Sequence, residues 1–270
     1  MSILGIDYAK CTDCGLCVRV CPRRYSEDKE QEKIIFNNAS GSCSLCGHCI
    51  AICPQEAILY EELGDDTHTF DGIANLSNYI PYEKLYNFLR ANRSIRLYKH
   101  KKVSEDILQK VIRAMECAPT AANIRGEKFV ILSDPGQLKA LSDAVIEELL
   151  KNPSTRSRFA ESFEIRKKIY EYPLYYDAPH IIIVYSSGRT TFEHFNIGNI
   201  ITYGRLAAQA LGLGTCWIGW TQIAFEFNPK LKKIAGVRGR SWGVMTIGYP
   251  DIKYLRCPPR SRKKVKGLIK

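Results

Sequence analysis

The sequence lacks the two features that would direct a chain into or across a membrane. Its first ten residues, Met1–Lys10, show no basic start followed by a long apolar run, so they do not resemble a secretory signal peptide. No stretch approaches the roughly 18 consecutive apolar residues that a transmembrane helix needs, and the run Ile181–Tyr185 is far too short. These absences exclude secreted and membrane-spanning classes, and we expect a soluble cytoplasmic protein with no membrane partner.

Cysteine, by contrast, is abundant, with 11 in 270 residues. Because no export signal is visible, a disulfide framework is not expected. Eight of these cysteines fall into two copies of the pattern C-x2-C-x2-C-x3-C-P, and the two copies form an internal duplication. The first copy contains Cys11, Cys14, Cys17 and Cys21, and the second contains Cys43, Cys46, Cys49 and Cys53.

This spacing predicts two [4Fe–4S] clusters. Three thiolates on one tight loop can reach three corners of a cube, while the fourth cysteine, after a helical turn, ligates the other cluster. The expected ligand sets are Cys11, Cys14, Cys17 and Cys53 for one cluster, and Cys43, Cys46, Cys49 and Cys21 for the other. Structural zinc sites are the alternative, but this run with proline directly after it is not a zinc-finger spacing.

The segment that contains the cysteines resembles a bacterial two-cluster ferredoxin along its whole length. We expect its short strands at Ile3–Ile6, Ile34–Phe36 and Ala57–Tyr60, and a solvated loop over the charged residues 23–42. The predicted ferredoxin-like domain covers residues 1–60. An acidic and polar stretch with several glycines follows over residues 61–81 and is typical of a linker.

Residues 82–270 interleave helical and strand signals, which predicts an α/β or α+β domain. Ser104 is a good N-cap for a helix whose apolar face extends from Ile107 to Met115. Further helices are expected at Pro135–Lys151, at about Phe192–Leu211 and after Asn228-Pro229. Strands are expected at Phe129–Leu132, His180–Tyr185, Thr215–Ile218 and Trp242–Ile247.

Five motifs in a fixed order resemble the FMN-dependent nitroreductase family, over about residues 82–264. The segment Asn92–Tyr98, N-R-S-I-R-L-Y, is similar to the family's R-R-S-x-R-x-F opening, and Ala118–Asn123 is similar to A-P-S-x-x-N. The other three motifs are Ala178-Pro179 before a buried strand, the helix-to-strand turn Leu211–Gly219, and Ile247–Pro250 with the basic end that follows it. The resemblance implies an α+β flavin domain with a mixed sheet flanked by helices, and a homodimer whose flavin sites use both subunits.

The resemblance also implies a set of FMN contacts. Arg93 and Arg96 would bind the phosphate with guanidinium forks and Ser94 with its hydroxyl. Arg260 and Arg262 match positions that close over the same phosphate, with a solvated basic tail as the alternative.

A second group of positions would contact the flavin ring. Asn123 would bond to its pyrimidine side, with Thr120 in the same motif, and Arg125 would lie near the flavin edge; the alternatives are a turn residue for Asn123 and a surface arginine for Arg125. The resemblance places three residues behind the ring, with a backbone N–H facing its N5 atom. These residues are Trp217, Ile218 and Gly219.

Two departures from the family pattern bear on the substrate rather than on the flavin. Arg125-Gly126-Glu127 stands where relatives often have Gln-Pro-Trp, and Trp220 stands where a glycine is common. Tyr172, Tyr175 and Tyr176 fall where the family places a variable lid. No side chain stands out as a general acid, so we assign no catalytic residue.

The formal net charge of +11 suggests nucleic acid as a partner. Two all-cysteine cubes would carry about −2 each and a flavin phosphate roughly −2 more, so much of the excess is internal counter-charge. We therefore expect no nucleic-acid partner, and a cluster-based sensor that binds DNA is the least favoured class.

Clusters carry one electron at a time, whereas flavin accepts one or two. The sequence therefore predicts an oxidoreductase that takes electrons from an external low-potential donor such as a ferredoxin. They would pass through the clusters to FMN and on to a small nitro, quinone, enone or halogenated compound. The alternative is a relay that passes electrons to a protein partner and has no small substrate of its own.

Overall fold

The computed structural model describes residues 2–38, 43–61, 65, 67–186, 188, 190–239, 242–263 and 265–267. They form two compact units, Met1–Tyr79 with Ala121–Ile124, and Ile80–Thr120 with Arg125–Lys270. The boundary after Tyr79 falls inside the segment 61–81 that the sequence predicts as a linker. Residues 62–64 and 66 of that segment lie outside the described residues.

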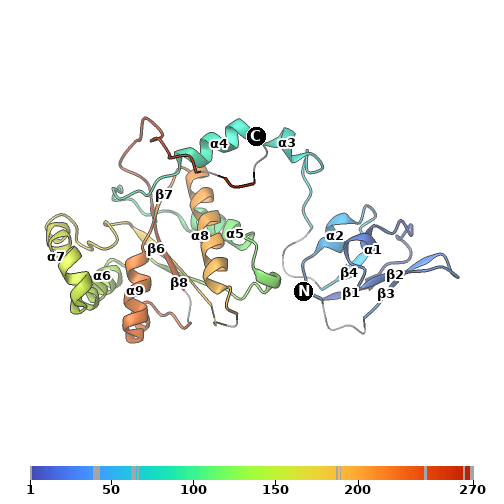
Figure 1. Ribbon diagram of the computed structural model, residues 1–270, viewed down its shortest axis with the longest axis horizontal. Coiled ribbons are helices and arrows are strands. Elements are labelled where there is room, and N and C mark those ends of the chain that lie inside the picture. Colours follow the sequence, from blue (N-terminus) through green and yellow to red (C-terminus); the bar gives the residue numbers. More distant parts are fainter. Residues whose placement is uncertain are drawn as a thin grey trace. The chain divides into compact units, whose positions relative to one another are not determined.

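The first unit contains two small antiparallel sheets and short helices (Figure 1). Strand β1 (Ile3–Ile6) pairs with β4 (Ile58–Tyr60), which confirms two of the predicted strands. Helices α1 (Leu16–Val20) and α2 (His48–Ile52) each begin directly after a cysteine loop, and α3 (Leu76–Tyr79) follows β4 in the chain. Gly15 and Gly47 precede α1 and α2 with φ of 70° and 74°, a left-handed conformation that glycine adopts without strain.

The prediction of a solvated loop over residues 23–42 is wrong for residues 25–36. Strand β2 (Tyr25–Asp28) pairs there with β3 (Lys33–Phe36) as a hairpin, and the polar turn between the two strands is exposed. The hairpin forms because Tyr25 is 2% exposed and its ring packs 5.5 Å from that of Phe36. Residues 39–42 of the predicted loop lie outside the described residues.

The second unit is built on a four-stranded sheet in the order β5-β6-β8-β7. Its strands pair antiparallel, and an isolated parallel bridge between Ser94 and Thr215 makes the sheet mixed. The strands are β5 (Lys128–Leu132), β6 (His180–Tyr185), β7 (Gly214–Trp217) and β8 (Trp242–Gly248).

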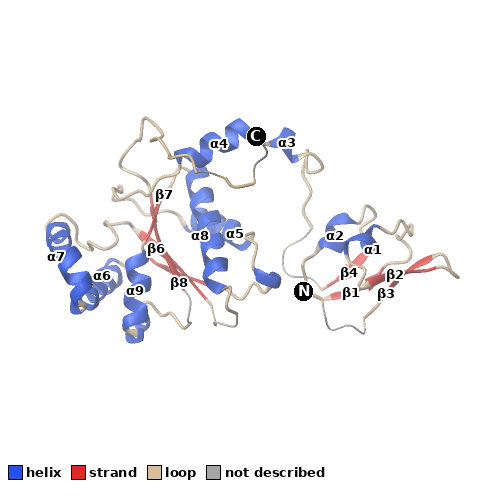
Figure 2. Ribbon diagram, in the orientation of Figure 1, coloured by secondary structure: helices blue, strands red, loops and turns tan. Residues whose placement is uncertain are grey.

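Helices cover both faces of this sheet (Figure 2). On one face, α5 (Glu105–Glu116) and α8 (Glu193–Ala210) pack together. On the other lie α6 (Pro135–Lys151), α7 (Pro153–Lys167) and α9 (Gly219–Phe227). The second unit also contains α4 (Tyr82–Ala91) and the 3-10 turn η2 (Pro229–Lys233), whereas the 3-10 turn η1 (Ala121–Asn123) is grouped with the first unit.

Strand β6 shows why helices are needed on both faces. Its consecutive residues alternate between the two cores: Ile181 and Ile183 belong to one, and Ile182 and Val184 to the other. All four are 0% exposed, as expected for a central strand that is apolar along its whole length. In the part of the chain that the structure describes, no helix has the length and apolar character to cross a membrane.

Candidate functional site

An arginine-rich cavity of about 700 Å³ lies in the second unit. Four of the residues predicted to bind FMN line it: Arg93, Ser94, Arg96 and Arg260. Six further residues complete the lining, and no acidic side chain is among them. They are Leu89, Asn92, Arg205, Tyr254, Arg256 and Pro258.

The segment that carries Ser94 is fixed against strand β7. Ser94 bridges to Thr215, and the Ile95 N–H donates to the Thr215 carbonyl at 2.9 Å. Gly214 permits this approach, because a Cβ atom there would lie 2.6 Å from Ile95 Cγ1. With Ile95 buried on the glycine, its neighbours Ser94 and Arg96 reach the cavity.

Two guanidinium groups of this cavity keep buried N–H groups without a hydrogen-bond partner, at Arg93 Nη2 and Arg205 Nε. Arg93 Nη1 donates to the Asn92 carbonyl at 2.5 Å, and Arg205 Nη2 donates to Asn92 Oδ1 at 2.9 Å. Within the described residues, no ion pair involves an arginine of this cavity. Buried cations are costly without a counter-charge, so the cavity is suited to an anion such as a phosphate monoester.

A second cavity, of about 200 Å³, shares Arg96 with the first. Trp217, Ile218 and Gly219, predicted to lie behind the flavin ring, all line it. Gly219 also begins α9, where the first backbone N–H groups of a helix have no partner within the helix. The other lining residues are Leu174, Tyr176, Cys216, Trp220 and Ile223.

In the first unit, cysteines of both copies line one cavity. Cys11, Cys14 and Cys17 of the first copy line one small cavity together with Cys53 of the second. Burial raises the pKa of the Cys11 and Cys17 thiols above the ordinary value, so their thiolates need a cationic partner such as iron.

Cys49 and Cys21, two of the other four cysteines, lie near each other. Burial first, then a hydrogen bond with Cys49 and the negative charges of Cys49, Cys17 and Cys21, raise the pKa of the Tyr25 phenol. The charge of Cys21 also contributes to the raised pKa of Cys49, so Cys21 lies near this member of the second copy. Among the described residues, no three His, Cys, Asp or Glu side chains are grouped to hold a single metal ion.

Four residues predicted to bind FMN do not line either flavin-domain cavity. The Arg125 N–H donates to Thr120 Oγ1 at 3.1 Å, and Arg125 Nη2 donates to the Glu116 carbonyl at 2.6 Å. Asn123, in the part of the chain grouped with the first unit, donates to the Leu45 carbonyl at 2.7 Å. Arg262 is exposed. Their contacts with a flavin remain predictions.

Sequence reasoning missed Arg205, and a signal for it was available. Arg205 follows Ile201 by four residues in α8, so it lies toward the apolar side of the helix that Ile201 and Ala208 bury. A charged residue in that position indicates function more than solvation. Arg256 lies four residues before the predicted Arg260. The general basicity of the C-terminal segment gave no reason to single it out.

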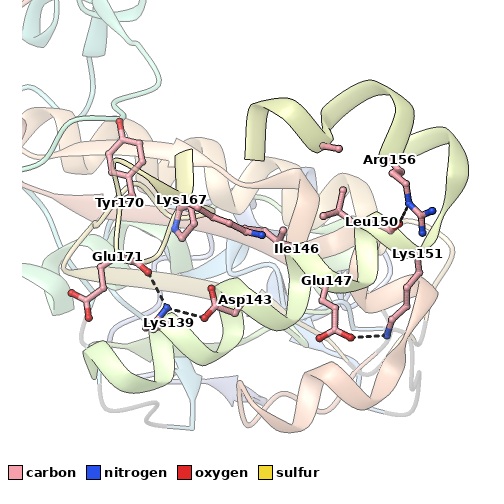
Figure 3. A pocket seen from close by; sticks show the side chains of 12 residues that line it. Lys139, Asp143, Ile146, Glu147, Leu150, Lys151, Arg156, Lys167, Tyr170 and Glu171 are labelled. Atoms are coloured by element: carbon pink, nitrogen blue, oxygen red, sulfur yellow. Dashed lines mark hydrogen bonds and ion pairs between the residues drawn. The ribbon is translucent and has the colours of Figure 1, made fainter. Parts of the chain in front are cut away.

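A larger cavity, of about 910 Å³, lies between α6 and α7 (Figure 3). Two of its lysines pair with carboxylates of the same helix, Lys139 with Asp143 at 2.9 Å and Lys151 with Glu147 at 3.4 Å. Arg156 Nε donates to the Leu150 carbonyl at 2.7 Å. Since these charges compensate each other at the surface, the cavity presents no set of groups for chemistry.

Two family models match separate segments of the chain. Residues 10–58 match the family model described as "4Fe-4S dicluster domain", and residues 89–249 match the model described as "Nitroreductase family". The second match covers more than half of the chain.

Individual relatives are distant. A protein of Archaeoglobus fulgidus, provisionally named NADH dehydrogenase/NAD(P)H nitroreductase, is 26% identical over 62% of this chain and 86% of its own. Iodotyrosine deiodinase of Thermotoga neapolitana is 24% identical over 62% and 89%. A solved structure of an FMN-bound nitroreductase from Bacteroides fragilis shares 22% identity, with a TM-score of 0.56 over 69% of this chain and 97% of that one, and so shares the fold.

Proposed function

Because the chain belongs to the nitroreductase family, we propose that it is an iron–sulfur flavoprotein reductase. Electrons from a low-potential donor enter through two [4Fe–4S] clusters of the dicluster domain and pass by way of FMN to a small acceptor. The observation that carries the proposal is the cavity with five arginines, two of which have buried N–H groups without a partner. A phosphate-bearing cofactor would supply the missing negative charge.

The residues of the arginine-rich cavity would hold the phosphate. Arg93 and Arg96 present guanidinium forks, which match phosphate oxygens two at a time, and Ser94 adds a hydroxyl donor. Arg256 and Arg260 approach the same space from the C-terminal segment. These positive groups attract the phosphate, so FMN should bind more tightly than a flavin without a phosphate.

The smaller cavity would hold the ring, since its walls are mostly apolar and aromatic. Trp217, Trp220 and Tyr176 offer flat surfaces, and the backbone N–H groups at Gly219 are donors at one edge. Bound FMN supplies the ability to exchange one or two electrons. The protein orients it and places Arg96, shared by both cavities, where a cation favours negative charge on the ring.

For the clusters, we retain the crossed ligand sets. Cys53 joins Cys11, Cys14 and Cys17, and Cys21 joins Cys43, Cys46 and Cys49. The mixed cavity of the first unit and the nearness of Cys21 to Cys49 support this assignment. Crossing also explains why the two copies fold as one unit, because each loop supplies a ligand to the other's cluster.

A ferredoxin-type donor would replace or supplement a nicotinamide, since a flavin that takes hydride directly needs no cluster. The test is anaerobic stopped-flow on the full chain, after its iron, sulfide and FMN contents have been measured. We expect a reduced ferredoxin to reduce the flavin quickly and NADH or NADPH to reduce it slowly. Fast reduction of the flavin by a pyridine nucleotide alone would overturn the proposal of a ferredoxin-type donor.

The acceptor we propose is a small nitro, quinone, enone or halogenated compound. The named activities of the relatives, nitroreductase and iodotyrosine deiodinase, support electron acceptors of this size and kind. Steady-state turnover with one member of each class, under a fixed supply of reduced ferredoxin, tests this step. No turnover with any of them, together with oxidation by a redox protein, would favour a relay instead.

We further propose a homodimer, as the family resemblance implies. Aromatic side chains exposed on and beside α8 support an interface there, with Phe195 70% and Phe192 55% exposed. Sedimentation of the flavin-loaded chain should give twice the chain mass. A monomer with full flavin occupancy would remove the inference.

A further inference from the structure

The motif that opens the flavin domain has an asparagine at its first position. The family pattern R-R-S-x-R-x-F begins with two arginines, whereas this chain has Asn92 followed by Arg93. One cation of the pattern is therefore absent from this segment. Asn92 still lines the anion cavity, and its side chain is bonded on both sides.

Arg205, more than a hundred residues later in α8, places its guanidinium on Asn92. Its Nη2 donates to Asn92 Oδ1 at 2.9 Å, and the Asn92 amide donates in turn to Gln209 Oε1 at 2.7 Å. Gln209 is itself held, because its Nε2 donates to the Phe88 carbonyl at 2.7 Å. Asn92 follows the last residue of α4 and is held by Gln209 of α8. In turn, the Asn92 side chain orients Arg205.

The Arg205 guanidinium lacks a full set of hydrogen-bond partners and a counter-charge among the described residues. Arg205 lines the cavity, its Nε is buried without a partner, and no ion pair among the described residues includes it. Burial also lowers the pKa of Arg205, which reflects how poorly this region solvates its charge. A half-buried cation whose buried N–H has no partner is stabilised when an anion joins it.

We propose that Arg205 is a phosphate-binding residue of the flavin site that replaces in space the first arginine of the pattern, and that Asn92 and Gln209 are its positioning residues. This inference rests on the proposed FMN site and goes beyond it, because it names a residue outside every motif of the resemblance. Arg93 Nη2, also buried without a partner, would share the same anion. The two guanidinium groups are joined through Asn92, whose carbonyl and side-chain oxygens each accept from one of them.

A comparison of FMN with riboflavin isolates the phosphate contact, since riboflavin has the same ring without the phosphate. Full-length protein with intact clusters is stripped of flavin and titrated anaerobically with each compound, and binding is followed by quenching of flavin fluorescence. In Arg205→Gln we expect the dissociation constant for FMN to rise about 10- to 100-fold, the range for a lost hydrogen bond to a charged group. Riboflavin binding should change by less than about twofold.

The matched control is Arg113→Gln, an exposed arginine of α5 that lines neither cavity, and it should bind both flavins as the natural chain does. Gln209→Leu removes the support of Asn92 and should weaken FMN binding alone, by less than Arg205→Gln does. An Arg205→Gln chain that keeps its preference for FMN, or that loses both flavins equally, would overturn the inference. If the natural chain shows no preference for FMN, the proposed flavin site itself has failed, which is a different outcome.

Should Arg205→Gln fail to fold, Gln209→Leu still carries the test, because it leaves Arg205 in place. The double variant Asn92→Arg/Arg205→Gln tests the exchange of the two positions directly. It returns the cation to the position that the pattern gives it, so we expect the preference for FMN over riboflavin to be restored to within about tenfold of the natural value. A folded double variant that binds the two flavins equally well would contradict the exchange of the two positions.

Discussion

Arg93 and Arg205 bring positive charge into a region that is partly closed to water, and among the described residues neither forms an ion pair with a carboxylate. A protein can keep such groups only if a ligand repays their desolvation, which is why they indicate a binding site more strongly than exposed lysines do. The same reasoning applies to the buried thiols of the first unit. Their raised pKa values favour protonated, uncharged sulfur until iron is present.

The crossed ligand sets make a prediction about Cys53. Cys53→Ala should damage the cluster that Cys14→Ala damages, although Cys46 lies closer to it in the sequence. Iron content should fall from about eight atoms per chain toward about four, and the electron paramagnetic resonance spectrum of the reduced protein should match that of Cys14→Ala. The control, Cys117→Ser, changes an exposed thiol outside both patterns and should leave iron unchanged. Agreement of Cys53→Ala with Cys46→Ala would disprove the crossing.

The buried His180 should make the free energy of unfolding depend on pH. Its Nε2 accepts from the Val103 N–H at 2.9 Å and its Nδ1 lies 2.6 Å from Ser133 Oγ, so this buried ring is held neutral. Burial, and then the charge of Lys102, lower the pKa of His180 below its ordinary value. The unfolded chain therefore binds a proton that the folded chain refuses. The stabilisation is complete above about pH 6.5 and is lost as the pH falls toward the lowered pKa, by at most about 1.4 kcal/mol per pH unit.

Urea denaturation between pH 5 and 7.5 measures this slope. Tryptophan fluorescence is a suitable signal, because all three tryptophans belong to the second unit. In His180→Gln, whose amide oxygen can accept from Val103 without titrating, the slope near pH 6 should be smaller than in the natural chain. Equal slopes would show that His180 does not control the acid limb.

At the scale of elements, α8 is the support of the flavin domain. It packs on α5 and on strands β7 and β8, and it carries Arg205 toward the cavity. Gly204 allows the close approach to α5, because a Cβ atom there would lie 2.7 Å from Met115 Cγ and 2.8 Å from its sulfur. Met115 is 0% exposed, and Met245 Cε would lie 3.1 Å from the same Cβ atom, so the contact is crowded.

Replacing each of two glycines in α8 by alanine should therefore change the free energy of unfolding in opposite directions. Gly204→Ala should lower the free energy of unfolding by about 1–3 kcal/mol, since it overpacks a closed interface. Gly198→Ala adds a methyl group that meets nothing within 4 Å and should stabilise the helix by up to about 1 kcal/mol. Denaturant titrations of both variants, followed by tryptophan fluorescence, give the comparison. A destabilised Gly198→Ala or a neutral Gly204→Ala would refute this view of the α5–α8 contact.

Elements with a strong local signal were predicted well. Helix α6 and strand β6 have the predicted bounds, because a proline after an aspartate N-cap starts the one and a continuous apolar run forms the other. Helices α4, α7 and α9 were not predicted. Helix α7 has only Phe163 buried and little apolar periodicity, so its position against α6 is a matter of tertiary contact.

At the scale of the whole molecule, the proposed order of electron transfer requires the clusters when ferredoxin is the donor. It does not require them when a small reductant reaches the flavin directly. In Cys46→Ala, which removes a cluster ligand from the full chain, a reduced ferredoxin should no longer reduce the flavin quickly. Dithionite, a small reductant that reaches flavin directly, should still reduce it at the natural rate. Stopped-flow absorbance at the flavin band measures both, and FMN content should stay equal to that of the natural chain. An undiminished rate with ferredoxin would show that the clusters are not on the path.

The sequence by itself determined what is written in local spacing: the two cysteine runs, the arginine and serine of the opening motif, and the apolar central strand. Each depends on residues within a few positions of one another, where chain geometry leaves few alternatives. Only the tertiary structure decided what depends on distant residues. It formed the β2–β3 hairpin around Tyr25 and brought Arg205 onto Asn92. Such contacts follow from packing, because burial selects partners by shape and charge whatever their separation in the chain.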